Sequence, residues 1–125
     1  MSTWTDAELT TVDAVDELYV ASVRPDGTMT RPVTIWAVRV DDRVYLRSVH
    51  GRGANWFKAT RASGLGHVSI GGVERDVIFT EITDDAEQAQ ISQAYQAKYG
   101  RYAKSIVDST RTPDALAATL LAIPR

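Results

Sequence analysis

The chain of 125 residues contains no cysteine. Disulfide bonds, thiolate metal sites and a cysteine nucleophile are therefore excluded. A chain without cysteine suits a reducing compartment. Residues 1–9 also lack the cationic start and apolar core of a secretory signal. We therefore expect a cytoplasmic protein.

Long apolar runs and an excess of one charge are also missing. No apolar run approaches the ~20 residues needed to span a bilayer, so we expect no membrane partner. The 14 basic and 16 acidic residues give a net charge of −2, which offers no bulk electrostatic support for binding nucleic acid. The length and the 44% hydrophobic content predict one domain, residues 1–125, with one core.

Catalytic signatures are scarce as well. Neither His50 nor His67 has acidic or histidine neighbours at metal-ligand spacing, so no metal site is predicted. No serine lies in a G-x-S-x-G turn, and the phosphate-binding pattern G-x-x-x-x-G-K-[ST] is absent. The residues therefore favour a binding site for a small molecule over a side-chain triad.

The hydrophobic pattern predicts short strands interrupted by helices. We expect strands at residues 18–23, 29–40, 43–49, 65–70 and 73–82, and helices at residues 6–15, 53–62, 85–99 and 102–109. Thr112-Pro113-Asp114 is expected to be a loop. Residues 115–123 carry mixed signals, because their alanines favour a helix and their apolar end allows a final strand.

The turns predict how these strands connect. Pro25-Asp26-Gly27 is typical of a β-turn, and Gly71-Gly72 is typical of a two-residue hairpin, because both glycines tolerate positive φ. The first three strands then form an antiparallel meander. With so few strands, a closed or nearly closed barrel avoids exposed edges. The predicted fold class is α+β, a six-stranded, mainly antiparallel β-barrel with peripheral helices.

The segment from Arg47 to Lys58 is the strongest candidate site. A strand pattern enters it and a helix pattern leaves it, with Arg52 between Gly51 and Gly53. Backbone N–H groups at a helix start and guanidinium groups both suit phosphate. An equally good interpretation is a plain loop with solvated cations, and the segment alone does not decide between them.

Two further clusters strengthen the hypothesis of a ligand site. Arg31, Thr34 and Trp36 lie on the strand expected to pair with the third strand, and Trp36 offers a flat wall for a planar ring. At the end of the long helix, Lys98 and Tyr99 are candidate catalytic residues that would orient or protonate a substrate. Each of these residues taken singly is also explained by packing or by an exposed surface.

The order of these motifs resembles the split-barrel flavoproteins, the superfamily of pyridoxamine phosphate oxidase and other FMN-binding split barrels. The resemblance is carried by Ile35-Trp36, by Trp56-Phe57-Lys58-Ala59-Thr60, by residues 66–72 and by Lys98-Tyr99-Gly100. Within this group the chain resembles an uncharacterised bacterial family, domain of unknown function 2255. The resemblance implies a six-stranded split barrel that forms a homodimer.

The resemblance also implies a cofactor, either FMN or a deazaflavin coenzyme. Deazaflavin-using relatives have a lysine in a longer glycine-rich loop, whereas Arg52 stands here in a shorter one, so the choice stays open, as does the absence of any cofactor. Carried over by position, the implied phosphate, ring and wall contacts are Arg31, Thr34, Trp36, Arg47, Ser48, Arg52, Asn55 and Trp56.

The function that follows is a flavin- or deazaflavin-dependent oxidoreductase acting on an unknown small molecule. In such an enzyme the cofactor carries the hydride chemistry, which explains the lack of a triad. Two alternatives stay open: a non-redox domain for small-ligand binding or interaction, and a cofactor-independent biosynthetic enzyme on the same scaffold.

Overall fold

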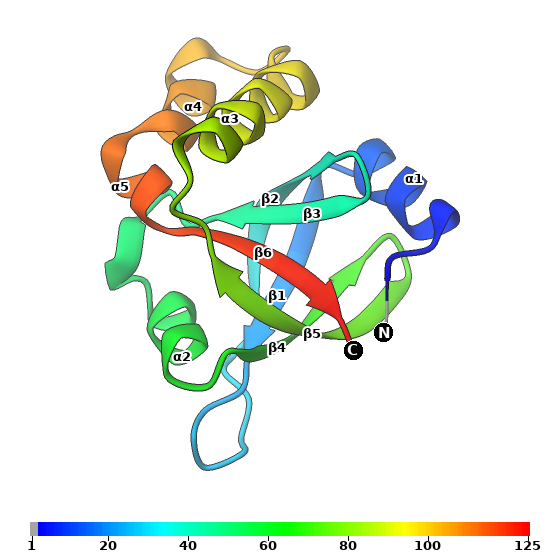
Figure 1. Ribbon diagram of the computed structural model, residues 1–125, viewed down its shortest axis with the longest axis vertical. Coiled ribbons are helices and arrows are strands. Elements are labelled where there is room, and N and C mark those ends of the chain that lie inside the picture. The colour runs from blue at the N-terminus through cyan, green and yellow to red at the C-terminus, as the bar shows by residue number, and fades with distance from the viewer. Residues whose placement is uncertain (1–2) are drawn as a thin grey trace.

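A computed structural model describes residues 3–125 and contains a closed barrel of six antiparallel strands (Figure 1). Around the barrel the strand order is β1-β2-β3-β6-β5-β4. The strands are β1 (Glu17–Ser22), β2 (Val33–Val40), β3 (Arg43–Arg47), β4 (Leu65–Ile70), β5 (Val73–Glu81) and β6 (Thr119–Pro124). The helices are α1 (Asp6–Ala14), η1 (Gly51–Gly53), α2 (Asn55–Ser63), α3 (Asp85–Tyr99), α4 (Lys104–Asp108), η2 (Ser109–Arg111) and α5 (Pro113–Ala117).

The predicted meander is confirmed, because β1 pairs with β2 and β2 pairs with β3. β2 begins at Val33 rather than at Met29. The chain between them contains Pro32, which cannot donate to a ladder, and only an isolated bridge joins Met29 to Val23. The barrel is closed where β6 inserts between β3 and β5. Closure leaves none of the six strands with an open edge.

The Gly71-Gly72 hairpin is also confirmed, with φ of 54° and 85°. β4 and β5 pair in register on either side of it, from Ile70 with Val73 to Leu65 with Ile78. A side chain at Gly71 would lie 2.7 Å from the Cγ2 atom of Thr11. This turn therefore needs glycine both for its backbone and for its contact with α1.

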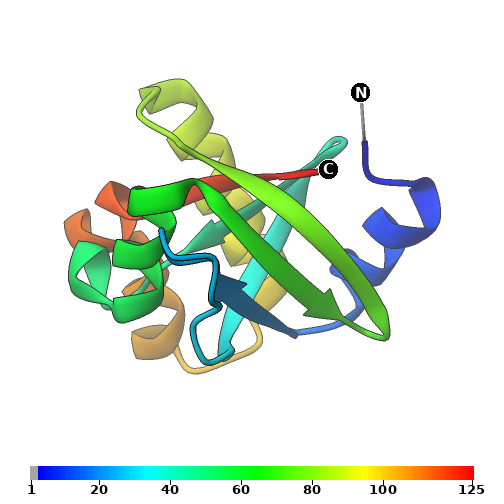
Figure 2. The same cartoon turned by 90° about the horizontal axis from the view of Figure 1, so that it is seen from below.

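Helices cover the two ends and one side of the barrel. α1 lies at one end, and α2 and α5 lie at the other (Figure 2). α1 begins with a capping box, in which the side chains of Thr5 and Glu8 each accept from the other residue's backbone N–H. α3 packs on β2 and carries Ile91, Tyr95 and Tyr99 into a second core outside the barrel. The main core fills the barrel interior.

The chain after α3 differs from expectation. Thr112-Pro113-Asp114 is not a loop: Thr112 caps α5, and its side chain accepts from the Ala115 backbone N–H. Proline is well suited to the first position of a helix, where its missing N–H costs nothing. The mixed signals of residues 115–123 arise because α5 ends at Ala117 and β6 begins at Thr119.

Candidate functional site

A cavity of about 210 Å³ lies between β2, the end of β3, α2 and the α3–η2 region. Its lining residues are Thr34, Ile35, Trp36, Arg47, Val49, His50, Trp56, Tyr95, Ile106, Ser109 and Thr110. The cavity thus joins the strand-to-helix junction to the second strand, because Arg47 and Trp56 line it together with Thr34 and Trp36. Its rim is apolar, because Val49 and Ile106 are both exposed.

Aromatic side chains form the walls of the cavity. The Trp36 ring stacks on Tyr99 with centroids 3.9 Å apart and parallel planes. The Tyr95 hydroxyl donates to the Trp36 carbonyl at 3.1 Å, and Trp56 packs edge-on against Phe57. These contacts fix the rings in place, so the walls are flat and pre-formed for a planar group.

The guanidinium of Arg47 is a buried part of the wall, 2% exposed. Its Nε donates to Thr119 Oγ1 at 3.0 Å, and one terminal nitrogen donates to Ser92 Oγ and to the Thr110 carbonyl. The other terminal nitrogen donates to the carbonyl and side-chain oxygens of Gln88 at 3.1 and 2.7 Å. All five N–H groups are used, so Arg47 offers a ligand its charge rather than a free donor.

The charge of this wall is not balanced within the cavity. The five acceptors around Arg47 are neutral, and burial lowers the pKa of its guanidinium. A guanidinium nevertheless stays protonated in proteins. Among residues 3–125, no aspartate or glutamate lines the cavity. The wall therefore carries a net positive charge that favours an anionic ligand.

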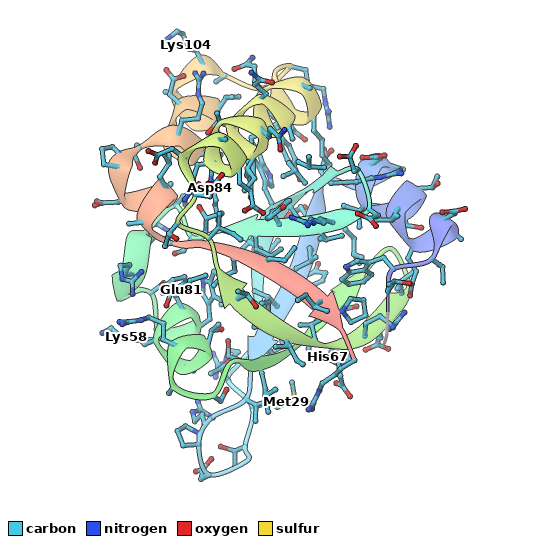
Figure 3. All side chains as sticks on the ribbon, viewed as in Figure 1. Met29, Lys58, His67, Glu81, Asp84 and Lys104 are labelled. Atoms are coloured by element: carbon cyan, nitrogen blue, oxygen red, sulfur yellow. The ribbon has the colours of Figure 1, made fainter. Side chains whose placement is uncertain are left out.

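Four predicted coenzyme contacts lie outside the cavity lining. Arg52 donates to Glu81 at 2.6 Å and to the Ala117 carbonyl at 2.8 Å, and Glu81 lies beside α2 in Figure 3. Ser48 is buried and donates to the Gly51 carbonyl. Arg31 and Asn55 are exposed, at the approach to β2 and at the start of α2.

The start of α2 nevertheless adjoins the cavity. Trp56, the second residue of the helix, lines it. The N-cap residue Ala54 has no side chain that can accept from the first turn. The first N–H groups of a helix have no partner within the helix. An uncapped helix start beside the cavity is suited to binding an anionic group.

Lys98 and Tyr99 do not line the cavity: Tyr99 lies behind the Trp36 wall, and Lys98 lies between α1 and β2. Lys98 Nζ donates to the carbonyls of Val12 at 2.5 Å and Ala37 at 2.7 Å, and burial lowers its pKa to about 8. Tyr99 is fully buried and donates to the Asp16 carbonyl. Burial raises the pKa of Tyr99. Their proposed catalytic role would require a substrate to reach this inner face.

His67 also lies elsewhere, on the outer face of β4 near the end of β6 (Figure 3). Its ring nitrogens face Asp76 at 2.9 Å and Glu74 at 3.2 Å, and the hydrogen bond to Asp76 raises its pKa most. Within residues 3–125 no group of three or more metal-ligating side chains is arranged to hold an ion. No helix in that range has the length and apolarity to cross a bilayer.

The cavity also contains residues that the sequence did not single out. Ile106, Ser109 and Thr110 come from α4 and η2, and His50 comes from the β3–η1 loop. The α4–η2 segment follows no recognisable motif, and it reaches the cavity only because α3 packs on β2. The sequence gives no sign that Ile106 lines a cavity, because its exposure follows only from the fold.

A family model for uncharacterized proteins conserved in bacteria, DUF2255, matches residues 8–121. The chain belongs to this family. No curated protein matches the chain. The family membership agrees with the resemblance seen in the motifs, and it assigns no activity.

Solved structures share the fold. The heme storage protein HutZ from Vibrio cholerae has a TM-score of 0.71 at 12% identity, covering 100% of this chain and 92% of its own. A FAD-binding protein from Mesorhizobium loti has a TM-score of 0.65 at 17% identity, covering 98% and 91%. An F420-H2 dependent reductase has a TM-score of 0.64 at 13% identity, covering 85% and 92%. At these identities the likeness concerns the split-barrel fold alone.

The residues present fit a coenzyme that lies across the cavity mouth rather than inside it. At about 210 Å³, the cavity is smaller than the roughly 300–1,000 Å³ pockets that enclose drug-sized ligands. The mouth offers the uncapped start of α2 for a phosphate and the exposed Val49 and Ile106 for an aromatic ring. The donor chemistry is thus compatible with a phosphorylated, planar coenzyme.

Proposed function

We propose that this protein is an oxidoreductase that binds a flavin or deazaflavin coenzyme at the mouth of the cavity. The observation that carries the proposal is the uncapped start of α2 beside a cavity with aromatic walls and an unbalanced positive charge. The split-barrel relatives named as FAD-binding and F420-H2 dependent support it by analogy. When bound, such a coenzyme supplies hydride transfer.

In this proposal each part of the site has a separate role. The N–H groups at the start of α2, with Asn55, hold the phosphate. Arg31, just before β2 at the end of the barrel that α2 covers, adds a second positive charge. Val49 and Ile106 support the ring at the mouth, and Trp36 and Trp56 in the cavity beneath keep water from its inward face. Arg47 stabilises negative charge that develops at the ring or the substrate, since a fixed cation in a dry wall acts strongly.

The proposal predicts that purified protein binds FMN or the deazaflavin coenzyme with a saturable change in tryptophan fluorescence. Trp36 and Trp56 both line the cavity, so a ring at the mouth alters their emission. The measurement is a fluorescence titration with each coenzyme separately. If neither coenzyme changes the emission at concentrations far above its usual affinity for enzymes, the proposal is wrong.

Substitutions at Ala54 test whether the coenzyme phosphate binds at the start of α2. Ala54→Asp supplies the missing cap, which typically stabilises a helix by about 1 kcal/mol, but puts a carboxylate where the phosphate would lie. We expect this variant to fold and to lose coenzyme binding. Ala54→Ser supplies a cap without charge and is the matched control. Equal binding by both variants would contradict the proposed phosphate position.

A non-redox ligand-binding domain is the second candidate function. It is favoured by the pairing of Arg52 with Glu81, which leaves this cation less available to a phosphate. A protein that binds a ligand but never oxidises a reduced coenzyme with any acceptor would belong to this class. The homodimer expected from the resemblance stays a prediction.

A further inference from the structure

We propose that the cavity beneath the coenzyme mouth is a separate pocket for the substrate, and that it binds a small planar anion with one aromatic ring and a carboxylate. The term substrate rests on the proposed function. The binding itself does not, because every wall of the cavity is supplied by side chains of this chain.

The size of the cavity limits the ligand to about one ring. A cavity of ~150 Å³ lined by apolar side chains holds benzene, and this cavity measures about 210 Å³. The difference leaves room for one small polar substituent. A flavin ring system with its side chain does not fit into this volume.

The walls select a planar ligand. Trp36, Trp56 and Tyr95 line the cavity from β2, α2 and α3. The Trp36 ring is held by its stacking on Tyr99, and its backbone carbonyl accepts from the Tyr95 hydroxyl. A flat ring between fixed aromatic walls binds at little cost in side-chain ordering.

The charge selects an anion. Arg47 is buried beside Tyr95, with its guanidinium carbon 5.5 Å from the ring centroid, and all its acceptors are neutral. Burying a charge without a counter-charge is costly. A ligand carboxylate would supply the negative charge that the described wall lacks. The walls and the charge together therefore favour an aromatic carboxylate over its neutral analogue.

The test compares benzoate with benzamide, which have the same ring and nearly the same size. Calorimetric titration of the coenzyme-free wild-type protein should give at least about tenfold tighter binding for benzoate, because the pair differs by a unit charge near a buried cation. This comparison needs no substitution of Arg47, whose loss is expected to destabilise the fold. Equal binding of the two compounds, or no binding of benzoate, would overturn the proposal.

A pair of threonine variants tests the location. Thr34 is exposed on β2 and lines the cavity, whereas Thr80 is exposed on β5 and does not. Thr34→Leu should fill the entrance and weaken benzoate binding at least about tenfold, while Thr80→Leu should leave it unchanged. Equal effects of the two substitutions would place benzoate elsewhere and contradict the proposal.

Competition distinguishes this proposal from the proposed function. Benzoate binding should persist when FMN or the deazaflavin coenzyme is saturating, because the two ligands occupy different spaces. Displacement of benzoate by a bound coenzyme would overturn the separate pocket and leave the coenzyme proposal intact. If benzoate binds and neither coenzyme does, the oxidoreductase fails and the anion pocket stands.

Discussion

Arg47 is the residue that links the stability of the fold to the charge of the site. Its guanidinium joins β3 to α3, η2 and β6 through partners 41 to 72 positions away along the chain. The same side chain carries the positive charge of the cavity wall. Replacing Arg47 therefore changes both the stability of the fold and the charge of the cavity wall.

Arg47→Met is therefore expected to destabilise the protein by about 2–4 kcal/mol, because several buried acceptors lose their donor at once. The measurement is the free energy of unfolding in urea. Arg111→Met is the matched control, since Arg111 is exposed and pairs only with Asp108 on the surface; we expect a change below about 0.5 kcal/mol. Equal effects of the two substitutions would show that the buried network contributes little.

The sequence indicated Arg47 as a functional cation but not its partners. Residue type and position at the end of a strand are local properties, and they were enough to predict a cation at the junction. The partners lie on α3, η2 and β6, which meet β3 only after the barrel closes. The ion pair between Arg52 and Glu81 could not be predicted for the same reason. It forms only because the fold places the end of β5 beside the η1–α2 region.

Among the helices and strands, those with strong local sequence signals, such as turn and cap residues, are the ones whose boundaries the sequence predicts. The boundaries of β4, the Gly71-Gly72 turn and α3 were predicted correctly because turn and cap residues determine them. The start of α5 is not predicted, because a five-residue helix has almost no periodicity and Thr112-Pro113-Asp114 is also typical of a loop. The cavity-lining role of α4 and η2 depends on tertiary packing and has no local signal at all.

β4 contains a glycine whose importance is steric. A Cβ atom at Gly66 would lie 2.3 Å from Cε2 of Phe79 and 2.7 Å from the carbonyl oxygen of Ala21. The ring can shift, but the carbonyl belongs to β1 and cannot move without disturbing the ladder. Gly66→Ala is therefore expected to cost about 1–3 kcal/mol.

Gly53→Ala is the matched control for this substitution, because a Cβ atom there meets nothing within 4 Å and φ is not positive. We expect its unfolding midpoint in urea to stay close to that of the wild type. Gly53 precedes α2 in the proposed phosphate site, so the variant also yields a folded protein for coenzyme titration. A stability loss at Gly53 as large as that at Gly66 would contradict the steric account.

At the scale of the whole molecule, closure of the barrel couples its two ends. α1 closes the end where β1 begins, and α2 closes the other end, where Ser22 Oγ donates to the Trp56 carbonyl (Figure 1). Trp4 anchors the first end: it is 7% exposed, and its Nε1 donates to the Ala122 carbonyl at 3.0 Å. In a ring of paired strands, loss of packing at one end weakens strands that continue to the other.

Trp4→Ala is therefore expected to lower the stability of the whole barrel by about 3–5 kcal/mol, the usual cost of removing a large buried aromatic side chain. The fluorescence of Trp36 and Trp56 reports on the remote end, because both residues line the cavity there. Its urea midpoint should fall together with that of the far-ultraviolet circular dichroism, as a two-state transition requires. Trp4→Phe keeps most of the packing but loses the hydrogen bond to the Ala122 carbonyl, and it should cost about 1–2 kcal/mol. If Trp4→Ala left the Trp36 and Trp56 transition at the wild-type midpoint, the two ends would unfold separately and closure would not couple them.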